Sequence, residues 1–310
     1  MLTKLINCYS KRRIFSSFSQ SLTRSRKIVA GLYFAVATQP IFWRKPISIE
    51  LPSKFFDSRD LKKLEGYIQR MMYTDQYLFQ RLSEQRIKGI RSWEYGQLLA
   101  LLQNQVSCRD WLVLDVGPGN STFPAFLSSY VKKVITIDYP NPLESPTSDN
   151  VQISTRSGVL STQGTMLQLP FRSTAFDLVT CISTIEHLDD PGTGEQIPYE
   201  QFLYITRVGL REMLRMVRPS GYLYLTTEAY VPELQTTDNW RSKKRAGQTI
   251  WSAYRIQDIG PVFLDTIMDE GFEIIGGCDY APEILISDPC RSTFRGRYFT
   301  TFCIYARRLV

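Results

Sequence analysis

Two short apolar runs constrain this fold more than any other feature. Each run carries an aspartate at or next to its last position. Residues 111–116 read WLVLDV and residues 133–138 read KVITID, and the turn GPGNS follows the first run. Continuous apolar runs of this length are typical of buried strands in a parallel sheet, and a glycine turn after such a strand leads into a helix. Asp115 and Asp138 are 23 residues apart, the length of one strand, helix, strand unit. The pattern predicts an α/β fold.

The turn after the first run has the properties of a nucleotide-binding loop. Gly117 and Gly119 would let a ligand approach the backbone, and amides near Ser121 can hold a ligand carboxylate. Asp138 stands where a ribose-binding carboxylate follows such a turn. The dinucleotide pattern G-x-G-x-x-G is incomplete because Thr122 occupies its third glycine position, and the lysine of a P-loop is missing. The turn alone therefore indicates a nucleotide-like ligand without naming it.

Further segments follow in an order that resembles the class I S-adenosylmethionine-dependent methyltransferases, in particular the type 11-like small-molecule enzymes. The matching segments are residues 114–121 (LDVGPGNS), 164–171 (GTMLQLPF), 175–179 (AFDLV), 181–188 (CISTIEHL), 210–226, 271–275 and 298–305. The resemblance covers about residues 91–310. It implies a Rossmann-like, doubly wound, mostly parallel seven-stranded sheet whose last two strands form an antiparallel pair.

The resemblance also implies S-adenosylmethionine as the methyl donor and no metal ion. The cofactor contacts that it assigns are Asp115, Gly117, Gly119, Asn120, Ser121, Asp138, Thr165, Met166 and Ser183. The family usually has an acid that contacts the adenine amino group where this chain has Thr165, which contributes no charge. Adenine is then expected to be held by the backbone near Met166.

Two residues after the fourth core strand are candidate catalytic groups, Glu186 and His187, the only histidine of the chain. In related folds this loop faces the transferred methyl group, so His187 could act as a general base or orient the substrate. The competing hypothesis is a structural Glu-His pair that shapes the loop. Methyl transfer mainly requires alignment of the nucleophile, the methyl group and sulfur, and a base is needed only when the acceptor loses a proton.

Charge divides the chain unevenly. Residues 1–49 hold nine basic side chains and no acidic one, whereas residues 50–310 hold 28 basic and 30 acidic side chains, about −2 of the total +7. The near-neutral body argues against a nucleic-acid partner. A transit peptide, a secretory signal, a peripheral membrane contact through residues 1–45, and a basic lead without a function of its own all remain open for the first segment.

We expect three parts in the chain. Residues 1–49 form the basic segment, and residues 50–105 form a helical extension with one helix ending at Gly89 and another over residues 93–103. Residues 106–310 form the methyltransferase core, with an insertion at about residues 228–252.

The cysteine pattern bears on the compartment. Six cysteines are scattered without any C-x-x-C pair, and with a single histidine this argues against zinc and favours a reducing compartment such as the cytoplasm.

The expected activity is methylation of a small molecule. Residues 91–95 (RSWEY) resemble the lead-in of methyltransferases found with cell-envelope saccharide biosynthesis, which favours O-methylation of a saccharide or lipid-linked acceptor. The alternatives are an RNA or protein methyltransferase and a non-catalytic, membrane-associated protein on the same fold.

Overall fold

The computed structural model describes residues 53–74, 88–103, 105, 108–119, 121–139, 158–189, 197–232, 253–276, 280 and 299–310. The strands are β1 (Lys54–Phe55), β2 (Leu112–Val116), β3 (Lys133–Asp138), β4 (Val159–Gln163), β5 (Phe176–Ile182), β6 (Val217–Tyr230), β7 (Tyr254–Arg255), β8 (Phe272–Ile274) and β9 (Phe299–Arg308). The α-helices are α2 (Asp60–Lys63), α3 (Glu65–Thr74), α5 (Lys88–Gln103), α6 (Phe123–Leu127), α8 (Tyr199–Met216) and α9 (Asp265–Asp269). Short helical turns are η2 (Cys108–Asp110), η3 (Ile185–Asp189), η5 (Ile256–Asp258) and η6 (Ile259–Leu264).

All described strands belong to one sheet, and the order of its strands indicates where a ligand would bind. Its order is β1-β9-β6-β5-β2-β3-β4, with β7 beside β6 and β8 beside β9. Strands β2 to β6 pair with one another in parallel, whereas β9 is antiparallel to β1, β6 and β8. Apart from the two-residue strands β1 and β7, this is the predicted mostly parallel sheet of seven strands with an antiparallel final pair. The strand order reverses beside β2, and ligands of α/β sheets bind at the carboxyl ends of strands at such a point.

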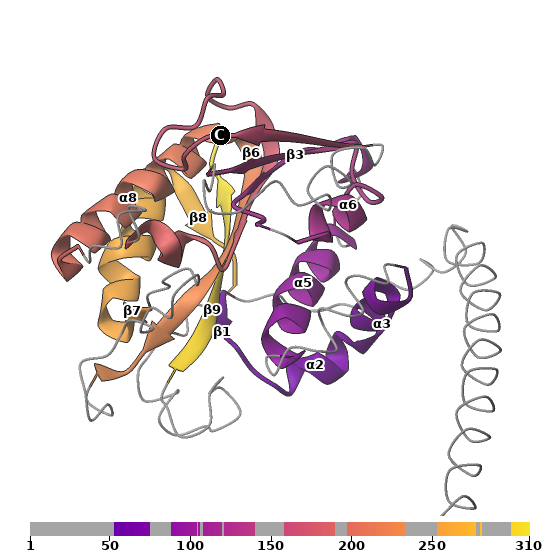
Figure 1. Ribbon diagram of the computed structural model, residues 1–310, viewed down its shortest axis with the longest axis horizontal. Coiled ribbons are helices and arrows are strands. Elements are labelled where there is room, and N and C mark those ends of the chain that lie inside the picture. The colour runs from indigo at the N-terminus through magenta and orange to yellow at the C-terminus, as the bar shows by residue number, and fades with distance from the viewer. Residues whose placement is uncertain are drawn as a thin grey trace, which may run out of the picture.

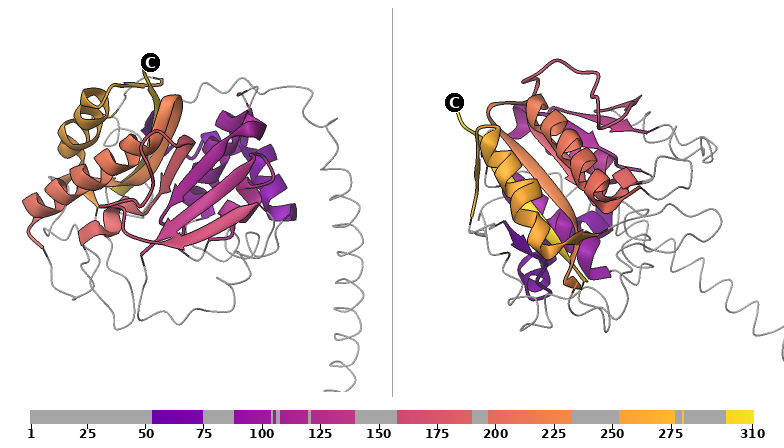
Figure 2. Two further views of the ribbon diagram at one scale, coloured as in Figure 1. Left: turned by 90° about the horizontal axis from the view of Figure 1, so that it is seen from above. Right: turned by 90° about the vertical axis from the view of Figure 1, so that its left-hand side faces the viewer.

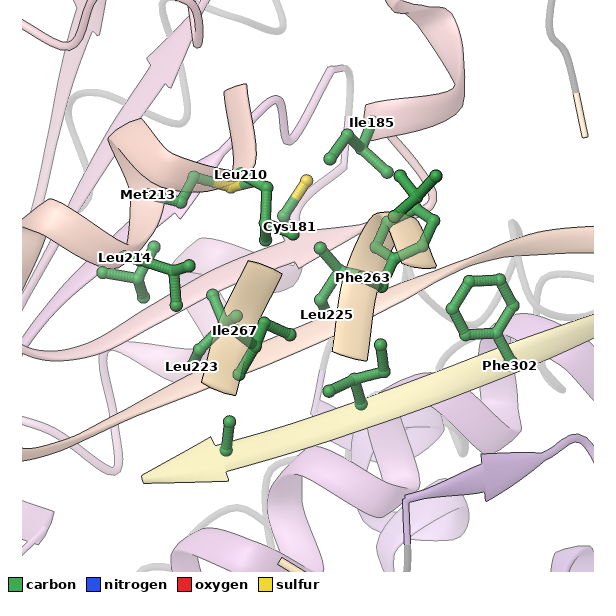
Figure 3. Packing of buried hydrophobic residues seen from close by; sticks show 14 of the residues in the cluster. Cys181, Ile185, Leu210, Met213, Leu214, Leu223, Leu225, Phe263, Ile267 and Phe302 are labelled. Atoms are coloured by element: carbon green, nitrogen blue, oxygen red, sulfur yellow. The ribbon is translucent and has the colours of Figure 1, made fainter. Parts of the chain in front are cut away.

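Helices cover both faces of the sheet, as the views in Figures 1 and 2 show. Helices α8 and α9 lie on one face, and α5 lies on the other with α2, α3 and α6 nearby. Figure 3 shows the first interface, where Leu210 and Met213 of α8 and Phe263 of η6 pack toward Leu223 and Leu225 of β6. All five side chains are fully buried, so hydrophobic burial holds this helical layer to the sheet.

The helical extension differs from the expected one at Gly89. The prediction that one helix ends at this glycine is wrong, because Gly89 lies inside α5, which begins at Lys88. A Cβ atom at this position would stand 3.4 Å from side-chain atoms of Leu61 and Phe56. This is an ordinary van der Waals distance, so Gly89 packs against the segment around α2 from within α5 and does not end a helix.

Several predictions fall wholly or partly outside the described residues. They concern the basic segment at 1–49, the cofactor contact assigned to Asn120 and most of the insertion at about 228–252. The insertion was expected to begin at about residue 228, but β6 continues to Tyr230. Within the described ranges, no helix combines the length and the apolar character needed to cross a membrane.

Candidate active site

The glycine turn follows directly from the end of β2. Gly117 and Gly119 have φ angles of +71° and +55°, in the left-handed region that side chains other than glycine rarely adopt. A Cβ atom on Gly117 would lie 2.0 Å from Thr184 Cγ2. Thr184 is also bonded to this turn, since its Oγ1 donates a hydrogen bond of 2.6 Å to the Gly117 carbonyl. The loop after β5 therefore fixes the turn and requires glycine at position 117.

Asp138, the last residue of β3, lies against the same turn. Its Oδ2 accepts a hydrogen bond of 2.7 Å from the Gly119 amide, and its Oδ1 accepts one of 2.8 Å from the Tyr139 amide. The structure thus brings together the turn and the acid that the sequence placed one structural unit apart.

A small pocket lies at this end of the sheet and includes a residue that the sequence analysis did not assign to the site. It is lined by Tyr95, Asp115, Gly117, Pro118, Ser121, Phe123 and Ile182. Tyr95 comes from α5, and its ring stacks on Phe123 at the start of α6, with centroids 4.0 Å apart and planes at 5°. Its hydroxyl lies 3.0 Å from Ser121 Oγ, which also accepts a hydrogen bond from the Phe123 amide. The sequence signal at Tyr95 is the RSWEY segment (residues 91–95), whose resemblance points to an acceptor class and does not assign Tyr95 to the cofactor site.

Asp115 is a buried acid at the inner end of the pocket. Thr180 Oγ1 donates a hydrogen bond of 2.6 Å to its Oδ1. Burial raises the pKa of Asp115 to about 7, although the Thr180 bond opposes the shift, and Asp138 adds to it. A cationic ligand group beside Asp115 would favour its charged form, so this carboxylate suits an ammonium group.

The predicted adenine contacts lie apart from the residues that line the pocket. Thr165 Oγ1 accepts a hydrogen bond of 3.2 Å from the Leu167 amide. Met166 is half-buried and packs against the cluster beneath α8. Neither residue lines the pocket. Their assignment to the cofactor therefore stays a prediction.

Ser183, also predicted to bind the cofactor, takes part in a buried polar network instead of lining the pocket. Its φ angle is +45°, and its Oγ donates a hydrogen bond of 2.6 Å to Glu94 Oε1. Thr226 Oγ1 of β6 donates to the same oxygen at 2.7 Å, and Arg91 Nη1 lies 2.8 Å from Glu94 Oε2. Glu94 is fully buried, and its backbone carbonyl accepts a hydrogen bond of 2.6 Å from Tyr224. This network joins α5 to the ends of β5 and β6.

The two candidate catalytic residues lie in η3, which follows Ser183 in the chain. Glu186 is buried, and its Oε2 accepts a hydrogen bond of 2.7 Å from Thr227 Oγ1. Burial raises the pKa of Glu186, while neighbouring His187 opposes the shift. The His187 amide donates to the Thr184 carbonyl at 2.9 Å, and its side chain is half-buried. The assignment of Glu186 and His187 as catalytic residues therefore stays a prediction.

The fold and the glycine turn define a Rossmann-like nucleotide-cofactor protein of the methyltransferase type. The left-handed turn has Asp138 against its Gly119 amide, and Gly117 of the same turn lines the pocket together with Asp115. Residues 114–194 match the family described as a methyltransferase domain. This part of the chain therefore carries a methyltransferase domain, the kind of domain that transfers a methyl group from a donor to an acceptor.

Several solved structures are similar over most of their length. They include the YcgJ protein from Bacillus subtilis, with 18% identity, a TM-score of 0.45 and coverage of 69% of this chain and 98% of that one. An S-adenosylmethionine-dependent methyltransferase from Mesorhizobium loti has 13% identity, a TM-score of 0.45 and coverage of 72% and 100%. One from Methanosarcina mazei has 16% identity, a TM-score of 0.43 and coverage of 65% and 94%. No curated protein matches the chain.

Proposed function

We propose that this enzyme methylates a hydroxyl group of a small-molecule acceptor, such as a saccharide or a lipid-linked compound. The observation that carries this proposal is the charge at the carboxyl ends of β5 and β6. Three carboxylates, Glu94, Glu186 and Glu228, interact there with one guanidinium group, Arg91. Arg91 is already paired with Glu94, so this cluster offers no unpaired cation to the phosphates of a nucleic acid, whereas its carboxyl groups can form hydrogen bonds with a neutral polyol.

The residues around the glycine turn would bind the methyl donor. Gly117 and Gly119 would let the donor approach the protein backbone. Asp138 would accept hydrogen bonds from the ribose hydroxyls of the donor, and Asp115 would face its amino group. Bound there, the donor supplies an activated methyl group on a positively charged sulfur. Tyr95 would close the pocket from the side of α5 and reduce the access of water.

The protein would accelerate transfer mainly by alignment. Fixing a nucleophile in line with the methyl group is worth about 7–11 kcal/mol in favourable cases. The bond between Thr184 and Gly117 would hold the loop after β5 against the cofactor turn, and so maintain this alignment. Glu186 and His187 would orient the acceptor beside the loop after β5.

Binding of the donor tests the first part of the proposal. Isothermal titration calorimetry should detect S-adenosylmethionine binding to the full chain, and Asp138→Ala should weaken it at least about tenfold, because two hydrogen bonds to a charged group are lost. An absence of binding, or unchanged affinity in the variant, would argue for the non-catalytic alternative.

A screen for the acceptor tests the second part. The enzyme and a methyl donor with a labelled methyl group would be incubated with fractionated metabolites, lipids, RNA and protein. Label is expected in a small-molecule or lipid fraction, in a form stable to mild base, as expected for an ether. Label in RNA, together with RNA affinity that falls steeply as salt increases, would contradict the proposal.

A further inference from the structure

Glu228 lies near the carboxyl end of β6, and one of its oxygens takes no part in the hydrogen-bond network around Glu94. Its Oε2 is buried and finds no hydrogen-bond partner among the described residues. Buried carboxylate oxygens are normally hydrogen-bonded, so an unpaired one in a native fold indicates that a further donor belongs beside it.

The register of the sheet places Glu228 next to the candidate active site. Ile182, which lines the pocket, pairs with Thr226 of β6, and Glu228 is the next residue of β6 on the same face. Thr226 binds Glu94 of α5, and the neighbour of Glu94 is Tyr95 of the pocket. Glu228 therefore lies two residues beyond Thr226, the β6 residue of the network that borders the pocket.

A second unpaired atom faces the same side of the sheet. Thr301 of β9 pairs directly with Glu228 across the two antiparallel strands, and such partners point to one face. Thr301 is fully buried, and its Oγ1 also finds no partner among the described residues. A carboxylate oxygen that needs a donor and a hydroxyl that can donate or accept together suit an alcohol, which can do both.

We propose that Glu228 contacts the hydroxyl of the methyl acceptor and receives its proton during transfer, with Thr301 as a positioning residue. This inference rests on the proposed function. The proton passes from the acceptor oxygen to Glu228 Oε2, and the acceptor oxygen forms a bond to the methyl carbon. The bond between methyl carbon and sulfur breaks, and its electron pair stays on sulfur. S-adenosylhomocysteine, a methyl ether and a protonated Glu228 are the products.

The electrostatic surroundings of Glu228 agree with this role. Burial raises its pKa to about 8; Glu186 and Glu94 add to the shift, and Arg91 opposes it. A base with a pKa near the working pH is the most effective in proton transfer. These three residues are the charged groups that act on Glu228 from α5 and η3.

The test compares the methyl donor with its product and needs no acceptor. A base that contacts the acceptor would lie within about 8 Å of the donor sulfur. This limit adds the hydrogen bond from base to acceptor oxygen, the distance from that oxygen to the methyl carbon, and the bond from methyl carbon to sulfur. The donor carries a positive charge on sulfur and S-adenosylhomocysteine does not, while both share the amino acid and nucleoside groups. The ratio of their affinities therefore isolates the charge on sulfur. Calorimetry at about pH 6.5 and about pH 9 measures this ratio on either side of the Glu228 pKa.

We expect the ratio to rise about tenfold in favour of the donor as Glu228 ionises. Glu228→Gln, which keeps the shape and removes the charge, should abolish the rise, whereas Glu273→Gln, in an exposed ion pair with Arg307, should leave it intact. Urea unfolding would verify that each variant is folded.

Other results would overturn the proposal. If the wild-type ratio does not change with pH, or if the rise persists in Glu228→Gln and disappears in Glu186→Gln, Glu228 is not the base. If neither ligand binds at all, the proposed function fails together with this inference.

Discussion

Replacement of Gly117 by alanine should destabilise the protein far more than the same replacement of Gly119. Both glycines have positive φ angles, which cost alanine about 1–2 kcal/mol at either position. Only at position 117 does the new Cβ meet an obstacle, since it would lie 2.0 Å from Thr184 Cγ2, whereas nothing lies within 4 Å of a Cβ at position 119. Thr184 must therefore move in the first variant only.

The structure sets the size of this difference. Ordinary contact between carbon atoms requires about 3.5–4.0 Å, so Thr184 must shift by about 1.5 Å or more. That shift breaks its hydrogen bond to the Gly117 carbonyl, a loss of about 1 kcal/mol, and overpacking adds about 1–3 kcal/mol. We expect Gly117→Ala to lower the free energy of unfolding by about 3–6 kcal/mol and Gly119→Ala by about 1–2 kcal/mol.

Urea unfolding followed by circular dichroism measures both values. The effect of alanine on the unfolded chain is the same in the two variants and cancels in the comparison. Adding Thr184→Ser to Gly117→Ala removes the nearest atom, and should recover about 1 kcal/mol or more, although Thr184 Cβ at 2.9 Å still crowds the site. If the two alanine variants differ by less than about 0.5 kcal/mol, the contact between Thr184 and the turn does not constrain the site as described.

Three further predictions concern charge and the pocket. Because folded Asp115 has a pKa of about 7 against 3.8 when exposed, the folded protein keeps a proton that the unfolded chain has released between these values. The free energy of unfolding should thus fall as pH rises from about 4 to about 7, and Asp115→Asn should reduce this slope in urea titrations; an unchanged slope would contradict the shift. Tyr95→Phe keeps the stacking on Phe123 but loses the bond to Ser121, so calorimetry should show donor affinity reduced a few-fold, and Tyr95→Ala a larger loss. Deletion of residues 1–45 should abolish binding to anionic lipid vesicles at low salt and leave donor affinity unchanged; vesicle binding by the shortened chain would refute the membrane role.

The sequence predicted the central part of the fold because its signals there are local. The apolar runs at β2 and β3, the turn at Gly117 and the acid at Asp138 are each recognisable within a few residues. Their spacing corresponds to one strand, helix, strand unit, whose geometry is nearly fixed. The contact between Asp138 and the Gly119 amide follows from that geometry.

The other half of the site could not be predicted because its contacts join distant segments. Glu94 meets Ser183 and Thr226 across 89 and 132 residues of sequence. No periodicity links these positions, so the role of α5 as a wall of the pocket was not apparent. The helix that contains Gly89 likewise packs against Leu61 and Phe56, a tertiary contact that the tendency of glycine to end helices does not report. The sequence predicts an insertion from about residue 228, whereas the actual length of β6 depends on its pairing with β9.

The central place of β9 has a consequence for how this protein is made. Strands β1, β6 and β8 all pair with β9, which follows every other described strand in the chain. During synthesis β1, with Lys54 and Phe55, leaves the ribosome long before its partner exists. The parallel strands β2 to β6 can associate earlier, but the β6 edge stays open until β9 arrives. Nascent chains stalled before residue 299 should therefore be the form most dependent on chaperones.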